Sequence, residues 1–211
     1  MTSPDPSTDG PLSRAQRQQQ TRAALVEAAR AVFARDGFAG ASLETIARDA
    51  GYSKGAVYSN FDGKAALFLA VMDHDLARLA VEDWDPFVRV PQRDEASNPV
   101  GAHLEDPGEA EVGIGFALAT LEFIAGAGRD ETLRAALRER VAVLVDAYAD
   151  VARRRRQDHD DPLTDVQLAS MLAALDQGTA LLMLGGWETV DTALLRRGLR
   201  RLLQPAPDET A

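Results

Sequence analysis

The chain has 211 residues, of which 45% are hydrophobic and 27% charged, a balance typical of a soluble globular protein of one or two domains. It contains no cysteine, which excludes disulfides, thiolate catalysis and cysteine-based zinc sites. No apolar run reaches transmembrane length and no secretory signal pattern precedes the first helical pattern, so we expect a cytoplasmic protein that does not enter a membrane.

The N-terminal quarter predicts a short tail and then helices. Residues 1–13 are rich in Pro, Ser, Asp and Gly, without periodicity, which favours a disordered tail. Apolar spacing predicts a long helix over 14–37, where a left-handed glycine would end it. Two short helices follow within 42–51 and 53–60, each opening on a serine that can serve as N-cap. A fourth helix begins near residue 63.

The remainder predicts a long connection and further helices. Residues 85–108 hold four prolines and alternating charge, which is typical of a connection without regular structure. Helical patterns return over 109–128, 130–156, 164–184 and 191–204. The last three open on side chains that can cap a helix: Asp130, Thr164 and Asp191. Because no strand alternation or internal repeat is present, the predicted fold class is all-α.

The formal net charge of −10 is unevenly distributed. Residues 14–64 carry eight lysines and arginines against five acidic residues, so the rest of the chain is strongly acidic. Both lysines of the chain, Lys54 and Lys64, lie in this basic stretch. A polyanion is therefore expected to bind near the N-terminus, if it binds at all.

Two short helices joined by a tight glycine-containing turn, over about 42–61, follow the helix-turn-helix plan. Val57 and Phe61 are expected to be buried, which leaves a lysine and small residues near the helix start to approach DNA. Phosphates bind favourably there, and hydroxyl or amide side chains can donate to phosphates and base edges. The residues predicted to contact DNA are Ser42, Thr45, Tyr52, Ser53, Lys54, Gly55, Tyr58, Asn60 and Lys64.

Other interpretations stay open for several of these residues. Tyr58 could be a half-buried core tyrosine, Tyr52 could only pack the turn, and the lysines could be ordinary solvated surface residues. Arg14, Arg17 and Arg22 could reach phosphates or the minor groove from the first helix, or face solvent.

Residues 21–73 resemble the N-terminal domain of the tetracycline-repressor (TetR) family of transcriptional regulators. The landmarks at the family's spacing are Ala28, Ala29, Phe33, Gly37, Phe38, Ile46, Ala47, Ala50, Gly51, Ser53, Gly55, Tyr58, Phe61 and Lys64. Tyr52 departs from the pattern, since the family usually has a smaller aliphatic residue there. That departure bears on the operator sequence rather than on the fold.

The resemblance implies a DNA-binding domain of three helices over 14–64, a larger helical ligand-binding and dimerisation domain over 65–204, and a tail at 205–211. Such proteins are homodimers that bind palindromic double-stranded operators. Their interface usually comes from the last two long helices, here 164–184 and 189–204. The apolar residues expected to supply it are Met171, Leu172, Leu175, Leu194 and Leu202.

The resemblance also implies a small-molecule effector of unknown identity, bound among the middle helices, that changes the spacing of the two DNA-reading helices. The candidates for its pocket are Trp84, Phe87, His103, Phe116, Phe123, Tyr148, Met171 and Gln177. Each could equally belong to an ordinary core. Glu122 and Asp176 interrupt apolar helices and could bind a cationic group, face solvent or lie at the dimer seam.

The sequence therefore predicts a sequence-specific DNA-binding transcriptional regulator, acting as a repressor that its ligand releases from the operator. We expect no enzyme activity, cofactor or metal, because no zinc motif, glycine-rich phosphate loop or catalytic pair stands out. Asp73, His74 and Asp75 point to different sides of a helix and cannot converge on one ion. The alternatives are a helical enzyme and a protein-interaction module with a vestigial DNA-binding head.

Overall fold

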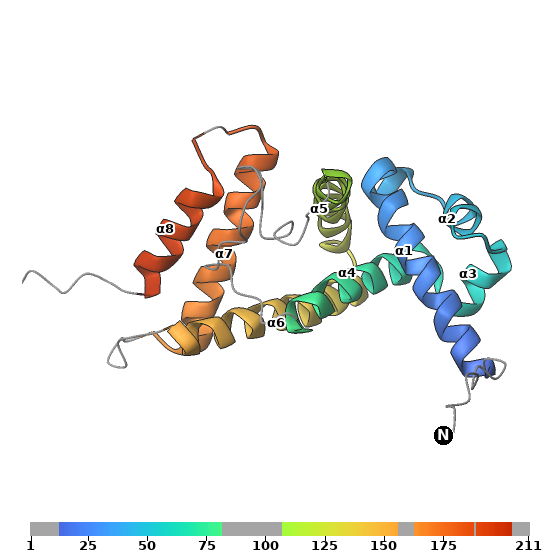
Figure 1. The fold of residues 1–211 in the computed structure, drawn as a ribbon, viewed down its shortest axis with the longest axis horizontal. Helices are drawn as coiled ribbons and strands as arrows, with labels where there is room; N and C mark the ends of the chain where they lie inside the picture. The colour runs from blue at the N-terminus through green and yellow to red at the C-terminus, as the bar shows by residue number, and fades with distance from the viewer. Residues whose placement is uncertain (1–12, 82–106, 156–162, 188, 204–211) are drawn as a thin grey trace, which may run out of the picture.

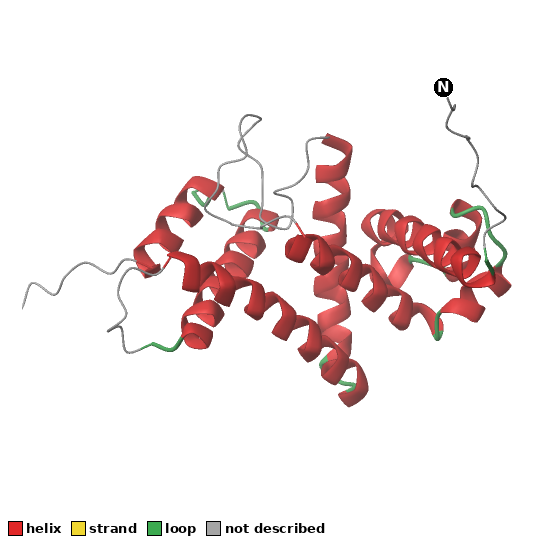
Figure 2. Ribbon diagram, turned by 60° about the horizontal axis from the view of Figure 1, so that its bottom comes forward, coloured by secondary structure: helices red, strands yellow, loops and turns green. Residues whose placement is uncertain are grey.

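The computed structural model describes residues 13–81, 107–155, 163–187 and 189–203, and the regular structure of these residues is entirely helical (Figure 2). The predicted all-α class is confirmed. In chain order the helices are α1 (Arg14–Gly40), α2 (Leu43–Asp49), α3 (Lys54–Asn60), α4 (Gly63–Val81), α5 (Pro107–Ala127), α6 (Glu131–Arg155), α7 (Asp165–Leu184) and α8 (Thr192–Leu203). The predicted tails, most of the 85–108 connection, and the pocket candidates Trp84, Phe87 and His103 lie outside the described residues.

Local side-chain caps explain where several helices begin. The Asp130 carboxylate accepts hydrogen bonds from the backbone N–H of Thr132 at 2.9 Å and of Leu133 at 3.1 Å, and so caps α6. The Thr164 hydroxyl accepts from the N–H of Gln167 at 3.2 Å, and the Gln167 side chain accepts from the N–H of Thr164, which forms a capping box before α7. These predicted caps are confirmed because capping depends on neighbours in sequence.

Two helix ends differ from the prediction. Gly37 interrupts α1 as expected, but its backbone angles, φ 71° and ψ 170°, are not those of the left-handed helix, and a further helical turn follows to Gly40. At the other site, α5 begins at Pro107, two residues earlier than predicted. Proline is tolerated in the first turn of a helix, where its missing N–H has no partner to lose.

The first hydrophobic core contains residues of all five helices from α1 to α5. Figure 1 shows α1, α2 and α3 at one end of the molecule, with α5 beside α1. Phe68 of α4 lies at the centre of this core, 4.9 Å from Phe33 and 4.7 Å from Phe123 between ring centroids. Phe38 and Phe116 complete the aromatic cluster. Packing is thus continuous across residues 64 and 65, the predicted domain boundary.

The second core joins the C-terminal part of α6 to α7 and α8, at the opposite end of the molecule (Figure 1). Tyr148, Leu168, Leu172 and Leu199 are fully buried in it. The expectation that Leu172 supplies dimer contacts is therefore corrected, since its side chain points into its own protomer. Met171, the residue before it, is 44% exposed.

Ion pairs fix α4 between its neighbours. Arg30 of α1 lies 3.2 Å from the carboxylate of Asp75, and Arg140 of α6 lies 2.7 Å from that of Asp73. The two acids thus face different helices, as the helical geometry requires. This arrangement explains the acidic residues around His74 without a metal ion.

Candidate nucleic-acid interface

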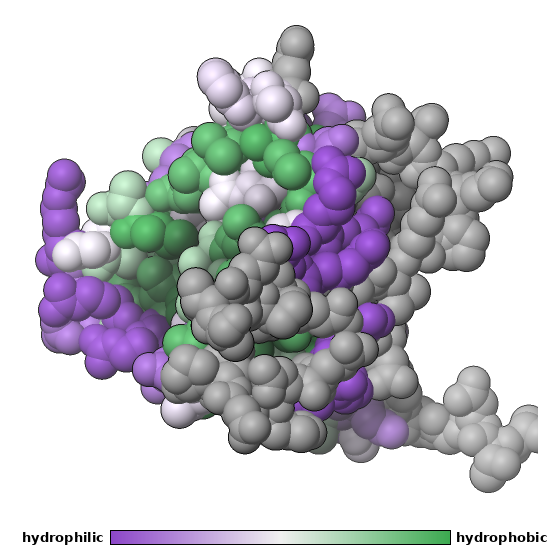
Figure 3. Space-filling model, turned by 90° about the vertical axis from the view of Figure 1, so that its left-hand side faces the viewer, coloured by the Kyte–Doolittle hydropathy of each residue, from purple (hydrophilic) through white to green (hydrophobic). Residues whose placement is uncertain are grey.

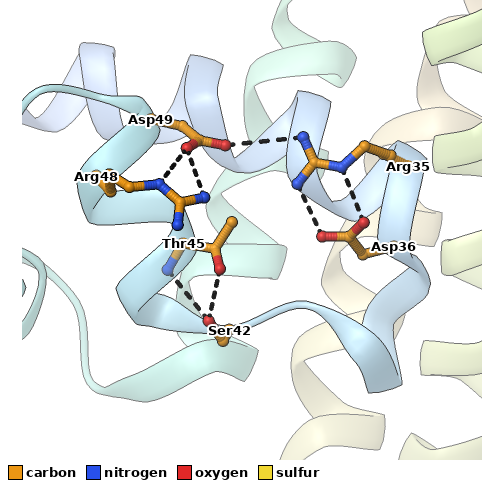
Figure 4. A network of polar contacts seen from close by, with 6 residues as sticks. All are labelled: Arg35, Asp36, Ser42, Thr45, Arg48 and Asp49. Carbon is orange, nitrogen blue, oxygen red and sulfur yellow. Dashed lines mark hydrogen bonds and ion pairs between the residues drawn. The ribbon is translucent and has the colours of Figure 1, made fainter.

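Ser42 starts α2 and positions Thr45. The Ser42 hydroxyl accepts a hydrogen bond from the backbone N–H of Thr45 at 3.1 Å, and it donates to the Thr45 hydroxyl at 2.9 Å (Figure 4). Both side chains are only partly exposed. They stand at the N-terminal end of α2, where hydroxyls can also reach a flanking phosphate.

The outward face of α3 carries the residues with the clearest capacity to read DNA. Ser53 caps the helix by accepting from the N–H of Ala56 at 3.2 Å. Val57 is fully buried, so the helix packs by one side. Tyr58 is 56% exposed, which excludes a half-buried core position. The other exposed residues of this segment are Tyr52, Ser53, Lys54, Gly55 and Ser59.

Gly55 has no steric reason within the protein to be glycine. A Cβ added there would meet only the Ser53 hydroxyl oxygen, at 3.6 Å, an ordinary contact. Without a side chain at this position the surface of α3 lies closer to the helix backbone, and no contact within the protein requires this. A low surface at this position lets the helix backbone approach a duplex closely.

Lys54 is paired with Glu44 of α2, an acidic residue that sequence reasoning did not single out. Their hydrogen bond is the main cause that raises the pKa of Lys54 and lowers the pKa of Glu44. The Lys54 ammonium also lies 5.8 Å from the centroid of the Tyr58 ring. Both groups of the ion pair are solvent-exposed, so a phosphate can take the place of Glu44.

Lys64 has a structural role that sequence reasoning missed. Its ammonium donates to the carbonyl oxygens of Ala39 and Ala41, each at 3.0 Å, and lies 4.9 Å from the Phe38 ring centroid. Because an ammonium carries three N–H groups, one remains for another acceptor. Contact between Lys64 and a phosphate stays a prediction.

Asn60 is turned back onto its own helix. Its side-chain amide donates to the carbonyl of Ala56 at 2.8 Å, and its backbone carbonyl accepts from Arg22 of α1 at 2.8 Å. The Arg22 guanidinium also lies 4.2 Å from the centroid of the Phe61 ring. Arg22 therefore braces the C-terminal end of α3 against α1, a contact between residues far apart in sequence that no local pattern indicates.

A surface network joins α1 to α2 (Figure 4). Arg35 lies 2.8 Å from Asp36 and 3.7 Å from Asp49, and Arg48 lies 3.0 Å from the same Asp49 carboxylate. The hydrogen bond between Arg35 and Asp36 raises the pKa of the former and lowers that of the latter. The network holds α2 against the end of α1.

The described pocket candidates do not all come together at one place, although Tyr148 and Gln177 both contact Asp176. Phe116 and Phe123 pack in the first core, Tyr148 lies in the second, and Met171 and Gln177 are exposed on α7. Tyr148 instead lies against Asp176 of α7, which is 1% exposed. Burial raises the pKa of Asp176 to about 6, although hydrogen bonds with Tyr148 and Gln177 act in the opposite direction.

Residues 25–71 match the family described as "Bacterial regulatory proteins, tetR family". The chain is 35% identical over 83 residues to the HTH-type transcriptional regulator TtgR of Pseudomonas putida, which covers 39% of this chain and 37% of TtgR. It is 38% identical over 60 residues to the HTH-type transcriptional repressor AcnR of Corynebacterium efficiens, 28% of this chain and 32% of AcnR. The match thus spans about a third of the length of these relatives.

The fold extends the likeness beyond the matched segment. A TetR-family transcriptional regulator from Rhodococcus sp. superimposes with a TM-score of 0.66 over 88% of this chain and 100% of its own, at 21% identity. The chain consists of an N-terminal helix-turn-helix region followed by a larger helical region. Residues 25–71 are thus similar to the TetR family in sequence, and the remainder of the described chain is similar to the solved structure in fold.

Proposed function

We propose that this protein is a sequence-specific transcriptional regulator that binds double-stranded DNA through α2 and α3. The observation that carries the proposal is the exposed face of α3, where Lys54, Gly55 and Tyr58 stand outward while Val57 is buried. A helix held this way can enter a major groove by its N-terminal residues. The helical-enzyme and vestigial-head alternatives explain neither the exposed tyrosine nor the small residue beside it.

The proposed contacts fall into two groups. Tyr52, Lys54, Gly55 and Tyr58 form the reading surface of the second short helix, together with its cap Ser53. Around it, Ser42 and Thr45 are proposed to hold flanking phosphates, and Lys64 one more through its remaining N–H group. Asn60 is proposed only as a supporting residue, because its amide is bound to Ala56.

We propose that the protein acts as a homodimer joined through α7 and α8. Figure 3 faces this end of the molecule and shows a hydrophobic area bordered by hydrophilic surface. The large apolar side chains exposed on α7, on α8 and between them are Val166, Met171, Leu181, Leu182, Trp187 and Leu194. A C2 pairing of these faces would bury them and would set two copies of α3 at the separation of successive major grooves, about 34–36 Å.

The apolar character of α7 has a second consequence. Among the described residues, α7 is the one helix long and apolar enough to span a membrane by length and composition. The core helix of a soluble protein passes the same test, and one face of α7 is packed in the second core. A helix between its own core and a partner's needs apolar residues on both sides, so we favour the dimer and a cytoplasmic location.

We propose further that a small molecule relieves repression by favouring a dimer with another spacing of its reading helices. The name of AcnR as a repressor supports the direction of regulation. Support for the effector itself comes from the likeness to the family. The pocket candidates Phe116, Phe123, Tyr148, Met171 and Gln177 remain part of this proposal, although no single site among the described residues holds all five.

The test is selection of bound sequences from a random duplex pool by the full chain. Enrichment of a palindrome with half-sites about one helical turn apart is expected. Tyr58→Ala should weaken binding to that palindrome by about tenfold or more, whereas Val143→Ala, an equally exposed apolar change on α6, should not. A pool without an enriched sequence would overturn the proposal.

A further inference from the structure

One residue of the last turn of α1, after the interruption at Gly37, is held from two sides. The N–H of Ala39 donates to the Glu122 carboxylate of α5 at 3.0 Å, and its carbonyl accepts from Lys64 of α4 at 3.0 Å. Lys64 also binds the carbonyl of Ala41, the residue before the Ser42 cap. The segment just before α2 is thus connected by one hydrogen bond to α5 and by two to α4.

Gly37 makes this arrangement possible. Its combination of positive φ, 71°, with an extended ψ, 170°, is one that residues with a side chain almost never adopt. A Cβ added there would also lie 2.6 Å from one Glu122 carboxylate oxygen. The same glycine therefore bends the chain and leaves the space through which Glu122 reaches Ala39.

A second contact fixes α5 against α1 two helical turns away. A Cβ added to Gly115 would lie 2.3 Å from the backbone carbonyl oxygen of Ala34, so the two helices touch backbone to backbone there. Glu122 and Gly115 are seven residues apart on the same helix, a separation of about 10 Å. With both ends of this segment held, α5 cannot tilt on α1 without pulling on the turn.

The Glu122 carboxylate makes its hydrogen bond outside its own helix. It is held by the charge-assisted hydrogen bond with the Ala39 N–H. The Glu122 carboxylate therefore holds the last turn of α1 through Ala39.

We propose that Glu122 is a positioning residue that fixes α2 and α3 relative to α5, and thereby sets the separation of the reading helices in the dimer. The dimer part of this inference rests on the function proposed above. A movement of α5 would reach the DNA-binding surface through the N–H of Ala39, with Lys64 holding the carbonyl of the same residue against α4.

The first test needs neither DNA nor a dimer. Because the chain has no cysteine, Ser59→Cys on α3 and Glu111→Cys on α5 can carry two spin labels, and excess unlabelled protein leaves one labelled chain per dimer. The distance distribution between the labels should be narrow in the parent protein. Glu122→Ala should widen it about twofold, and Glu122→Gln should keep it narrow, because an amide oxygen still accepts from Ala39.

Glu139→Ala, which changes another exposed glutamate, on α6, is the matched control and should leave the distribution narrow. An unchanged width in Glu122→Ala, with the same unfolding temperature as the parent, would overturn the inference. That result would stand whatever the duplex pool gives, so it is distinct from failure of the proposed DNA binding.

The functional readout is the dependence of affinity on half-site spacing. Removing one base pair between the half-sites should cost the parent protein about tenfold or more. Glu122→Ala should reduce that penalty to about threefold and leave binding to a single half-site unchanged, and Glu122→Gln should restore the parent value. A full spacing penalty in Glu122→Ala would contradict the positioning role.

Discussion

Gly55 is a residue that folding disfavours and that DNA binding is proposed to require. Glycine destabilises a helix by up to about 1 kcal/mol relative to alanine. The nearest atom to an added Cβ is the Ser53 hydroxyl oxygen at 3.6 Å, so the protomer gains nothing from the glycine. A residue that the fold disfavours, on the outward face of α3, indicates a requirement set by a partner.

Gly55→Ala should therefore raise the free energy of unfolding by up to about 1 kcal/mol and weaken operator binding by about tenfold or more. Denaturant unfolding and fluorescence anisotropy on the selected duplex measure the two effects. Ser59→Ala, on the same helix, serves as control for affinity. If Gly55→Ala binds as tightly as the parent protein, the close approach of α3 to DNA is wrong.

Asp176 is a buried acid whose titration should be visible in stability. Its pKa is raised from 3.8 to about 6 by burial, so the folded state disfavours the ionised form. Well below pH 3.8 the carboxyl is neutral in both states and carries no penalty. As the pH rises to 6 the unfolded chain ionises first, and stability falls by up to about 3 kcal/mol.

Asp176→Asn removes that ionisation. It should stabilise the protein at pH 8 by up to about 3 kcal/mol and have little effect at about pH 3. Urea unfolding at the two pH values measures the difference. An equal change at both would show that packing against Tyr148, rather than charge, governs the site.

Residue-scale features could be predicted from the sequence where they depend on near neighbours. The caps Ser42, Ser53, Asp130 and Thr164 each act within three residues and were all predicted. The hydrogen bond between Glu122 and Ala39 joins residues far apart in sequence, so no local pattern could indicate it. The role of Lys64 was missed for the same reason.

At the scale of elements, α7 shows why an apolar pattern alone does not define an interface. Its inward residues Leu168 and Leu172 pack on α6 and α8, whereas Leu181 is 53% exposed. The sequence predicted that α7 contributes to the dimer but could not assign each leucine to its own core or to the partner. That assignment depends on how α6 and α8 are placed.

Leu181→Glu should convert the dimer to a monomer and abolish high-affinity operator binding while the helices remain folded, because a buried, unpaired charge is costly in an apolar interface. Analytical ultracentrifugation, circular dichroism and anisotropy give the three readouts. Val143→Glu, at a similarly exposed apolar residue of α6, should remain a dimer. Dimers that persist in Leu181→Glu would place the interface elsewhere.

Across the whole molecule, two cores lie at opposite ends of the chain's fold, with α4 and α6 running lengthwise between them (Figure 1). Composition and periodicity predicted the all-α class and the basic N-terminal quarter. They did not predict that α5 would pack with α1 in the first core, because which helix packs on which depends on contacts such as Gly115 against Ala34.

The charge distribution of the whole molecule makes a final prediction possible. A protein of net charge −10 is repelled by DNA as a body, so attraction must come from few cations, with Lys54 foremost. Each phosphate contact contributes about −0.9 to the slope of log affinity against log salt. Since a dimer presents Lys54 twice, Lys54→Ala should make that slope less negative by about 2.

Glu44→Gln supplies the opposite test, because it removes the acid that pairs with Lys54 without removing the cation. Its affinity should rise at low salt, since Lys54 no longer has to exchange Glu44 for a phosphate, while the salt slope stays at least as steep. Anisotropy titrations at salt concentrations from about 50 to about 200 mM measure this slope and so distinguish the two variants. A salt slope unaffected by Lys54→Ala would mean that Glu44 keeps this lysine from the phosphates. The arginines of the N-terminal quarter would then supply the attraction to DNA.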